Sequence, residues 1–379
     1  MKPVNFSFPT QIQFGPGVRV RLGDVLKTRG KARPLVLTDQ GVAGLPFFKS
    51  IVADLDKAGL ATLVFSGVVG NPVKSQVTAG VAAFKAHNAD SLVVIGGGAA
   101  LDVGKAVALM AHHPGDLFDY EDDKPDGLPV DREIPFIVAM PTTSGTGSEV
   151  GRSAVISDDA THVKKIIFSP RLLAPVVLAD PELTLGLPAG MTAATGMDAL
   201  SHCVEAFLSK GFHPMCDGIA LEGVRLVSQS LVACVKEPND IEARTNMMMA
   251  SMMGAVAFQK GLGVTHSLAH SLSAVCDMHH GLANAIMLPA AMRFNKSAVE
   301  GRIARLAATV GAGSTADAFV DWLVALNAEI GTPKTLGAVG VQRGHLKALV
   351  DIAVEDVCHG CNEKPVTRED FESLFAEAL

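Results

Sequence analysis

Short apolar runs alternate with amphipathic stretches along the first half of the chain. Five runs have the composition and length of buried strands, at residues 34–38, 61–65, 91–95, 134–140 and 174–179. The amphipathic stretches between them include residues 73–88 and 102–111. Strands separated by helices of this length form βαβ units, so the pattern predicts a parallel sheet with helices on its faces.

The pattern changes near residue 182, where strand-like runs give way to long helical patterns. These patterns cover residues 192–209, 217–234, 241–258, 266–276, 301–310, 316–326, 343–354 and 368–378. We therefore predict two domains. The first is an α/β domain of residues 1–182 with a parallel, Rossmann-like sheet, and the second is an all-helical domain of residues 183–379.

Composition narrows the class of protein. The 379 residues carry a net charge of −7 and 48% of them are apolar, which argues against a disordered chain and against a nucleic-acid binder. No apolar stretch reaches the roughly 18 to 20 residues of a membrane span, and the first residues lack the apolar core of a secretory signal. Six cysteines are too few for a disulfide scaffold, so we expect a cytoplasmic protein. Only 19% of the residues are charged, which favours a surface partly covered by another subunit.

Two loops after predicted strands have the composition of phosphate-binding sites. Residues 96–98 are three glycines that follow a strand and open a helix, so their backbone N–H groups could approach a pyrophosphate. Residues 141–149 follow the next strand and hold several hydroxyl side chains and two glycines. Either loop alone could be a tight turn, but two at the carboxyl ends of parallel strands predict a nucleotide site.

Asp39 stands at the end of the strand 34–38, before the glycine loop rather than after it. A carboxylate at such a strand end can bind both ribose hydroxyls of NAD and repel the 2′-phosphate of NADP. The other interpretation is a turn-forming Asp before Gly41, and the sequence leaves both open.

Carboxylate and imidazole side chains gather in the helical half, where the surrounding residues are small and apolar. The sequence holds two pairs spaced four residues apart and one adjacent pair: Asp198 with His202, His266 with His270, and His279 with His280. Spacing of four places two side chains on one helix face. Since unpaired polar groups are costly in apolar surroundings, this set predicts a metal site.

Cys358 and Cys361 form a CxxC motif near the end of the chain. No second pair completes a zinc site. We therefore favour reduced cysteines, buried or lining a pocket, over a structural zinc.

Taken together, these motifs resemble the iron-containing (group III) alcohol dehydrogenases, a family with the dehydroquinate synthase-like fold. The resemblance covers nearly the whole chain. It rests on the order and spacing of the blocks GGGAALDVGKA, PTTSGTGSEV, DPELT, GMDALSHCVEAFLS, THSLAHSLSAVCDMHHGLANAIMLP and, near the end, DVCHGCN.

The resemblance implies roles for individual residues. The implied metal ligands are Asp198, His202, His266 and His280, and His270 is the implied catalytic residue that helps move the proton. The implied cofactor-binding residues are Asp39, Asn71, Gly97, Gly98, Ala99, Asp102, Thr142, Thr143, Thr146, Val155, Lys164 and Leu183. Phe258 and Cys358 match positions near the substrate pocket.

The resemblance also implies the reaction, a hydride transfer between a small alcohol or hydroxy acid and NAD rather than NADP. One divalent metal is expected, Fe(II) in preference to Zn, in a homodimer or a multiple of dimers. Two alternatives stay open: a metal- and NAD-dependent lyase of the dehydroquinate synthase type, and a non-catalytic metal or nucleotide binder of the same fold.

Arg152 and Lys260 bear on the substrate, since each could place a positive charge at the pocket mouth and favour an anionic alcohol or aldehyde. The alternative is that both side chains are solvated or paired with an acidic neighbour such as Glu149.

Overall fold

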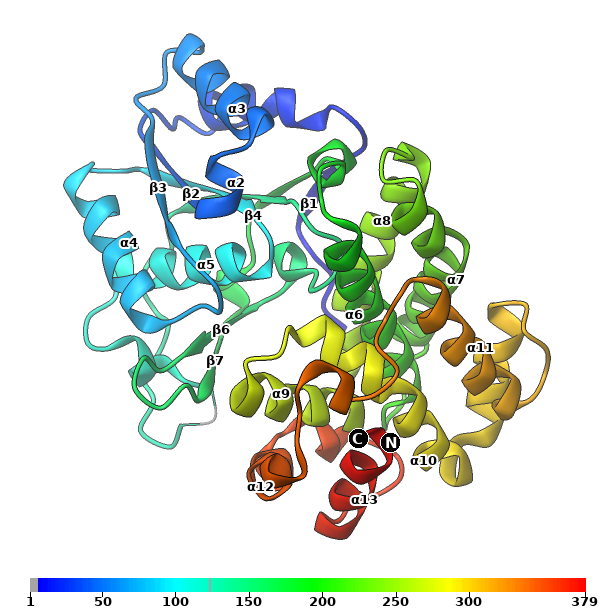
Figure 1. Ribbon diagram of the computed structural model, residues 1–379. Coiled ribbons are helices and arrows are strands. Elements are labelled where there is room, and N and C mark those ends of the chain that lie inside the picture. Colours follow the sequence, from blue (N-terminus) through cyan, green and yellow to red (C-terminus); the bar gives the residue numbers. More distant parts are fainter. Residues whose placement is uncertain (1–5, 123) are drawn as a thin grey trace. The chain divides into compact units, whose positions relative to one another are not determined.

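The computed structural model describes residues 6–122 and 124–379; residues 1–5, the start of the predicted first domain, and residue 123 lie outside the described residues. The chain divides into two compact units (Figure 1). The α/β unit comprises Phe8–Thr143 and Gly147–Thr184. The helical unit comprises Leu185–Leu379 together with Ser144–Thr146 and the described residues before Phe8. The hydroxyl-rich loop is therefore shared between the two units.

The α/β unit is built on a six-stranded parallel sheet in the order β1-β8-β5-β4-β2-β3, beside a two-stranded antiparallel sheet of β6 and β7. The strands are β1 (Gln11–Phe14), β2 (Pro34–Asp39), β3 (Leu63–Val68), β4 (Ser91–Gly96), β5 (Phe136–Pro141), β6 (Ser153–Ser157), β7 (Lys164–Phe168) and β8 (Val176–Ala179). All five predicted strands are present, within three residues of the expected bounds. The sequence interpretation missed β1, β6 and β7, which are short and only partly buried.

Helices cover both faces of the large sheet. The unit contains α1 (Leu22–Thr28), α2 (Gln40–Ala43), α3 (Pro46–Lys57), α4 (Lys74–Ala86) and α5 (Gly98–His112), with the 3-10 turns η1 (Val18–Arg21), η2 (Leu117–Tyr120), η3 (Ser148–Val150), η4 (Pro170–Leu172) and η5 (Pro181–Thr184). Apolar residues of α1 and α3 pack on alternate positions of the strands, such as Val93 and Ile95. The α5 helix packs on the other face, where a Cβ at Gly104 would lie 2.5 Å from Val94. This arrangement confirms the predicted parallel sheet covered by helices.

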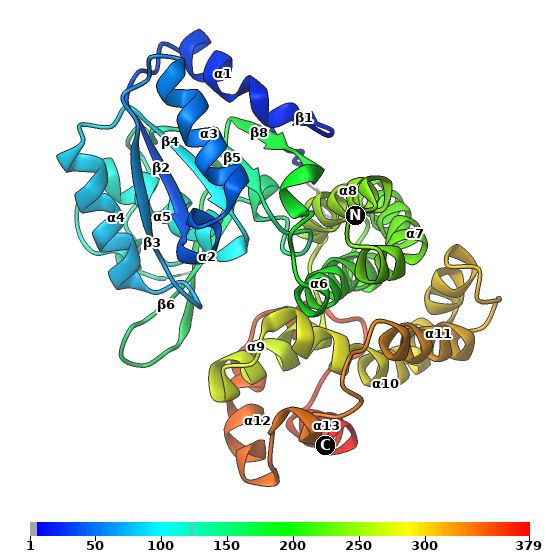
Figure 2. The same cartoon turned by 45° about the horizontal axis from the view of Figure 1, so that its top comes forward.

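The helical unit contains α6 (Ala189–Leu208), α7 (Pro214–Lys236), α8 (Ile241–Ala257), α9 (Val264–Cys276), α10 (His280–Thr309), α11 (Ala316–Glu329), α12 (Leu346–Glu355) and α13 (Arg368–Ala378), with η6 (Phe258–Lys260), η7 (Gly337–Val339), η8 (Arg343–His345) and η9 (Cys358–Cys361). One apolar core joins these helices, and α10 contacts α6, α9, α11 and α13 (Figure 2). The sequence predicted only the last third of α10. Pro289 lies inside this helix and Val299 has a non-helical backbone, and both features interrupt the helical pattern.

The α7 helix is long and apolar enough to cross a membrane by length and composition, which the sequence analysis did not anticipate. Half of its most apolar window is buried. Val224, Val227 and Leu231 are fully buried, and the helix packs against α6 and α8. These contacts are those of a core helix within the unit.

Candidate metal centre and cofactor loops

Asp198 and His202 lie one turn apart on α6, a helix buried along most of its length. Asp198 is 3% exposed and His202 is 6% exposed. Close helix packing sets their positions, because a Cβ at Gly254 of α8 would lie 3.0 Å from the Cβ of His202. A carboxylate and an imidazole are therefore held rigidly on one face of a core helix.

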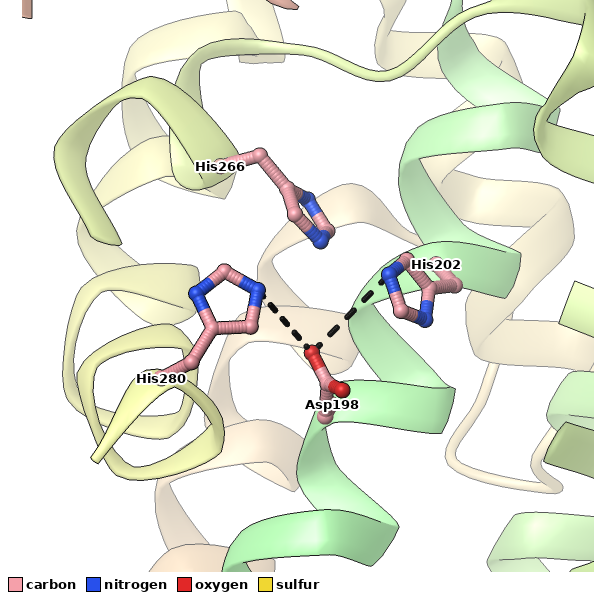
Figure 3. Close-up of side chains that lie close together, drawn as sticks. All are labelled: Asp198, His202, His266 and His280. Carbon is pink, nitrogen blue, oxygen red and sulfur yellow. Dashed lines mark ion pairs between the residues drawn. The ribbon is translucent and has the colours of Figure 1, made fainter. Parts of the chain in front are cut away.

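His266 on α9 and His280 at the start of α10 complete the group. Figure 3 shows the four side chains pointing toward one another. One donor atom from each residue lies within 4.8 Å of the others. The Nε2 atoms of His202 and His280 lie 3.9 Å and 3.4 Å from Asp198 Oδ1. The sequence-predicted ligand set is thus brought together from three helices.

Gly281 allows the start of α10 to lie against α6. A Cβ at Gly281 would lie 2.1 Å from the carbonyl oxygen of Ala194, which no backbone contact tolerates. The neighbouring His280 is thereby placed beside Asp198. The glycine after the last ligand is therefore needed for close approach rather than for an unusual backbone angle.

The electrostatics of the group suit a divalent cation. Burial lowers the pKa of His202 to about 4, although the Asp198 carboxylate acts in the opposite direction. His202 is therefore neutral near pH 7 and keeps a lone pair for coordination. One carboxylate and three imidazoles without a thiolate form a donor set that suits Fe(II), Zn and related metals. The residues present therefore fit a divalent metal.

Glu205 supports the group and was not anticipated from the sequence. It lies on α6, 2% exposed, and its Oε2 accepts a 2.7 Å hydrogen bond from His266 Nδ1. Its carboxylate also accepts from the backbone N–H groups of Gly263 and Thr265 at the start of α9. Burial raises the pKa of Glu205, but the hydrogen bonds from His266 and Thr265 outweigh this and hold it below its usual value.

The hydrogen bond between Glu205 and His266 changes the pKa of His266 in the opposite direction. Burial lowers the pKa of His266, but the hydrogen bond with Glu205 outweighs burial and raises it above the usual value. A carboxylate on one ring nitrogen fixes the orientation of the ring and leaves the other nitrogen for a metal. The signal for Glu205 was its place seven residues after Asp198, on the same helix face.

Asn284 is a second residue that the sequence interpretation missed. It is fully buried on α10, one turn after His280. Its side-chain nitrogen donates to Asp198 Oδ1 at 2.8 Å and lies 3.2 Å from His280 Nε2. Asn284 therefore orients the carboxylate of the ligand group.

A second cluster lies beside the first and consists of His270, Asp356 and Cys358, with one donor atom of each within 4.8 Å of the others. His270 Nδ1 lies 2.7 Å from Asp356 Oδ2, and Ser267 donates to Asp356 Oδ1 at 2.7 Å. The His270 ring stacks on that of His280 with centroids 5.1 Å apart. His270 is thus held by a carboxylate next to the ligand group.

The CxxC motif forms the short turn η9. Burial raises the pKa of the Cys358 thiol well above its usual value, so this side chain stays protonated. Among the described residues, no cluster of candidate metal ligands joins Cys358 with Cys361. None of the six cysteines forms a disulfide bond.

Phe258 and Lys260 both lie in η6, after α8. The Phe258 ring contacts the His202 ring, with centroids 5.1 Å apart, so this side chain borders the ligand group.

Lys260 does not present a free charge, because its ammonium donates to Asp217 at 2.6 Å and its side chain is 2% exposed. The hypothesis of a substrate-binding Lys260 is wrong for that reason. Arg152, in the α/β unit, lies over the Phe168 ring at 5.3 Å.

The glycine loop of the α/β unit has the geometry of a strand-to-helix turn. Gly97 is the N-cap of α5, and Gly98 and Ala99 begin the helix. A Cβ at Gly97 would lie 3.3 Å from Thr143, so the two predicted cofactor loops lie side by side. Thr142 joins them through its N–H, which donates to the carbonyl of Gly96 at 3.0 Å. The N–H groups at the start of α5 are the donors of the predicted anion site, which stays a prediction.

Asp39 stands beside this loop. Its Oδ1 caps the short helix α2 by accepting from Val42 N at 2.8 Å, as the turn interpretation predicts. Its Oδ2 would lie 3.2 Å from a Cβ placed on Gly96, so Asp39 also borders the glycine loop. Both interpretations therefore agree with its position.

The remaining predicted cofactor residues occupy different settings. Both oxygens of Asp102 already accept hydrogen bonds, from Ser148 Oγ and from Val155 N, so this residue braces the hydroxyl-rich loop. Leu183 belongs to the core of the α/β unit and is 3% exposed. The others are Asn71, exposed before α4; Val155 and Lys164, half-buried on the β6–β7 sheet; and Thr146, which groups with the helical unit.

Known protein families match the two halves of the chain separately. Residues 9–181 match the family described as iron-containing alcohol dehydrogenase, and residues 192–379 match the C-terminal part of the Fe-containing alcohol dehydrogenase family. A 4-hydroxybutyrate dehydrogenase of Cupriavidus necator is 37% identical, with 92% of this chain and 93% of the relative covered. An NAD-dependent methanol dehydrogenase of Bacillus methanolicus is 36% identical, with 99% and 100% covered.

A solved structure of a 1,3-propanediol oxidoreductase has the same fold, with a TM-score of 0.95 and 34% identity over the whole of both chains. These matches confirm an oxidoreductase that acts on alcohols or aldehydes, in place of the lyase and the non-catalytic binder. The chain therefore belongs to the iron-containing alcohol dehydrogenase family.

Proposed function

We propose that this enzyme interconverts a short primary alcohol and its aldehyde with NAD, at a divalent metal held by Asp198, His202, His266 and His280. The observation that carries the proposal is the convergence of these four donors within 4.8 Å in a buried setting. Fe(II) is the proposed metal, since the donor set contains no thiolate. The relatives support the substrate class, because their names refer to small molecules with a terminal hydroxyl group.

When bound, the metal supplies a Lewis acid that favours the alkoxide form of an alcohol or polarises the aldehyde carbonyl. The surrounding residues keep this acid in place: Glu205 fixes the His266 ring and Asn284 fixes the Asp198 carboxylate. The half-buried Phe258 ring beside His202 offers an apolar wall for a short carbon chain.

His270 is proposed to carry the proton between the substrate oxygen and solvent. Asp356 accepts a hydrogen bond from Nδ1, which leaves Nε2 as the ring atom that can take or release a proton. The side chain is 26% exposed, so it contacts solvent, whereas His266 does not. Cys358 lies in the same cluster and is proposed to border the substrate.

The proposed NAD site uses the loops of the α/β unit. Backbone N–H groups of Gly97, Gly98 and Ala99 at the start of α5 would hold the pyrophosphate. Thr142, Thr143 and Thr146 would supply hydroxyl contacts. Asp39 beside the loop would accept from the adenosine ribose and disfavour a 2′-phosphate. The remaining cofactor contacts proposed are Asn71, Asp102, Val155, Lys164 and Leu183.

We also propose that the protein forms a homo-oligomer in a reducing, cytoplasmic compartment. The six free cysteines support the compartment, and the low share of charged residues supports a covered surface.

The test is a substrate screen with protein purified anaerobically and loaded with Fe(II). NADH formation is measured with methanol, 1-butanol, 1,3-propanediol and 4-hydroxybutyrate, each with NAD and with NADP. We expect turnover of at least one alcohol that requires the metal and prefers NAD. A metal-loaded enzyme that turns over none of them, in either direction, would overturn the proposal.

Cofactor choice has its own variant. Asp39→Gly removes the carboxylate that disfavours the 2′-phosphate, so kcat/KM with NADP should rise relative to NAD.

Arg152→Ala tests whether Arg152 binds an anionic substrate. If it does, this variant should lower kcat/KM for 4-hydroxybutyrate and not for 1-butanol in the same screen.

A further inference from the structure

A small cavity lies inside the helical unit, and none of the four ligand residues lines it. Its volume is about 10 Å³, which is room for about one water-sized species. Ser144, Thr192, Thr195, Cys234 and Arg244 are among its lining residues. The cavity is therefore polar on several sides and too small for any part of a nucleotide.

Arg244 brings a positive charge to this cavity. It is 3% exposed, and its guanidinium donates from Nε to the carbonyl of Pro238 at 3.1 Å and from Nη1 to Thr192 Oγ1 at 3.0 Å. Its Nη2 is buried and has no hydrogen-bond partner. Within residues 6–122 and 124–379, Arg244 forms no ion pair with a carboxylate. A buried charge without a counter-ion is costly.

The backbone adds to this positive field. Arg244 stands in the first turns of α8, and Thr192 stands in the first turns of α6. The N-terminal end of a helix carries partial positive charge, so both helices favour an anion here. The N-cap Pro188 of α6 makes no side-chain cap, whereas Asp240 caps α8 by accepting from the N–H groups of Glu242 and Ala243.

The remaining lining groups bring no negative charge to the cavity, since Leu187 and Met247 are apolar and the hydroxyls of Thr192 and Thr195 donate to backbone carbonyls. The hydroxyl of Ser144, which is 8% exposed, is buried and has no hydrogen-bond partner. Burial raises the pKa of the Cys234 thiol to about 11, so it stays neutral. The lining contains no acidic side chain. Arg244 Nη2 and Ser144 Oγ, two buried polar atoms without a hydrogen-bond partner, thus belong to residues that line one small space.

We propose that this cavity binds one monatomic anion of the chloride class, held by Arg244 Nη2 and Ser144 Oγ. A water molecule would satisfy the same two atoms but would leave the guanidinium charge uncompensated. Chloride satisfies both atoms and also supplies the missing negative charge. Larger oxyanions such as sulfate exceed the space.

The first experiment locates the ion. Crystals of the full chain grown from chloride-free solution are soaked in bromide, whose anomalous scattering marks its position. We expect a peak between Arg244 and Ser144 that chloride displaces. A water-sized density without an anomalous signal would overturn the proposal.

The second experiment measures the energetic effect. The melting temperature of the enzyme is followed as sodium gluconate is replaced by sodium chloride at constant ionic strength. We expect a saturable rise of about 2 °C or more when chloride exceeds half-saturation tenfold. Equal melting temperatures in the two salts would contradict the proposal.

Variants assign the effect to this cavity rather than to any other anion site. Ser144→Ala and Arg244→Gln should weaken or abolish the chloride-dependent rise. Ser251→Ala is the matched control, because Ser251 also lies on α8 with a buried, unpartnered hydroxyl but does not line the cavity. If Arg244→Gln fails to fold, Ser144→Ala decides: an unchanged chloride response in Ser144→Ala would count against the site.

Discussion

Two histidines one turn apart on α9 each pair with a carboxylate from another part of the helical unit, and the two pairs differ in their surroundings. His266 with Glu205 and His270 with Asp356 have the same Nδ1–oxygen distance of 2.7 Å. The first pair is almost fully buried, with side chains 1% and 2% exposed. The second is 26% and 15% exposed. The same chemical pair therefore serves a buried region and a half-exposed region.

This difference in burial supports different proposed roles for the His266 and His270 rings. His266 faces three other donors and is held by a carboxylate that also caps α9, so it suits a fixed ligand. His270 contacts solvent and stacks on His280, so it suits a proton carrier beside the ligands. Either assignment fails if the variants below behave alike.

The largest effect should follow loss of a ligand. His266→Ala should lose most of the bound metal and lower kcat/KM by roughly 10⁴-fold, because Lewis-acid stabilisation disappears with the metal. His280→Ala should do the same. Metal content by elemental analysis and kcat/KM for the best alcohol are the two measurements. Full metal occupancy in either variant would remove that residue from the ligand set.

His270→Ala is the contrast to the ligand variants. It should keep its metal while turnover falls by roughly 10²-fold and the pH profile of kcat changes, because general acid–base catalysis is lost. If this variant is isolated without metal, His270 is a fifth ligand and the two pairs on α9 have the same function.

Variants of the two supporting carboxylates, Glu205 and Asp356, should also differ in their effects on metal affinity and turnover. Glu205→Gln should weaken metal affinity by roughly 10- to 100-fold, because the Gln cannot hold the His266 ring as a charged acceptor does. Asp356→Asn should leave metal affinity nearly unchanged and lower turnover with an altered pH profile. Competition with a metal chelator measures the affinity of both variants. Equal losses of affinity would erase the distinction between the two pairs.

The smallest expected effect is on the pH dependence of the folding stability of the metal-free protein. The folded pKa of His202 is about 4, below its ordinary value of 6.5, so the unfolded chain binds this proton first as pH falls. Stability should therefore fall between about pH 6.5 and pH 4 and stay level above that window as far as His202 is concerned. The melting temperature of His202→Asn should depend less on pH than that of the wild type. An identical pH dependence would show that His202 does not titrate in this way.

Sequence patterns predicted the parallel sheet because buried strands are short, apolar and separated by helices. They missed β1, whose partner β8 is distant in the sequence. They also missed the hairpin of β6 and β7, two short strands that are only partly buried. The first part of α10 was missed because Pro289 and polar positions obscure its periodicity. The tertiary core, which no local pattern displays, holds this helix in place.

The pattern predicted a metal site because imidazole and carboxylate pairs at helical spacing stand out among small apolar residues. The choice of the four proposed ligands among these side chains came from the family resemblance. Glu205, Asn284 and Asp356 were not assigned, since each acts by contacting a residue 61, 86 or 86 positions away in the sequence. Lys260 was misjudged for the same reason, because its partner Asp217 lies 43 positions away. Supporting contacts of this kind require the three-dimensional arrangement.

The most direct test of the central claim is the stoichiometry of Fe(II) binding to metal-free protein under anaerobic conditions. The four-donor site predicts one Fe(II) per chain in the wild type and almost none in Asp198→Ala at the same free metal concentration. Leu200→Val on the same helix serves as the control for local packing, since Leu200 is buried but offers no donor. Equal stoichiometry and affinity in wild type and Asp198→Ala would contradict the metal site proposed here.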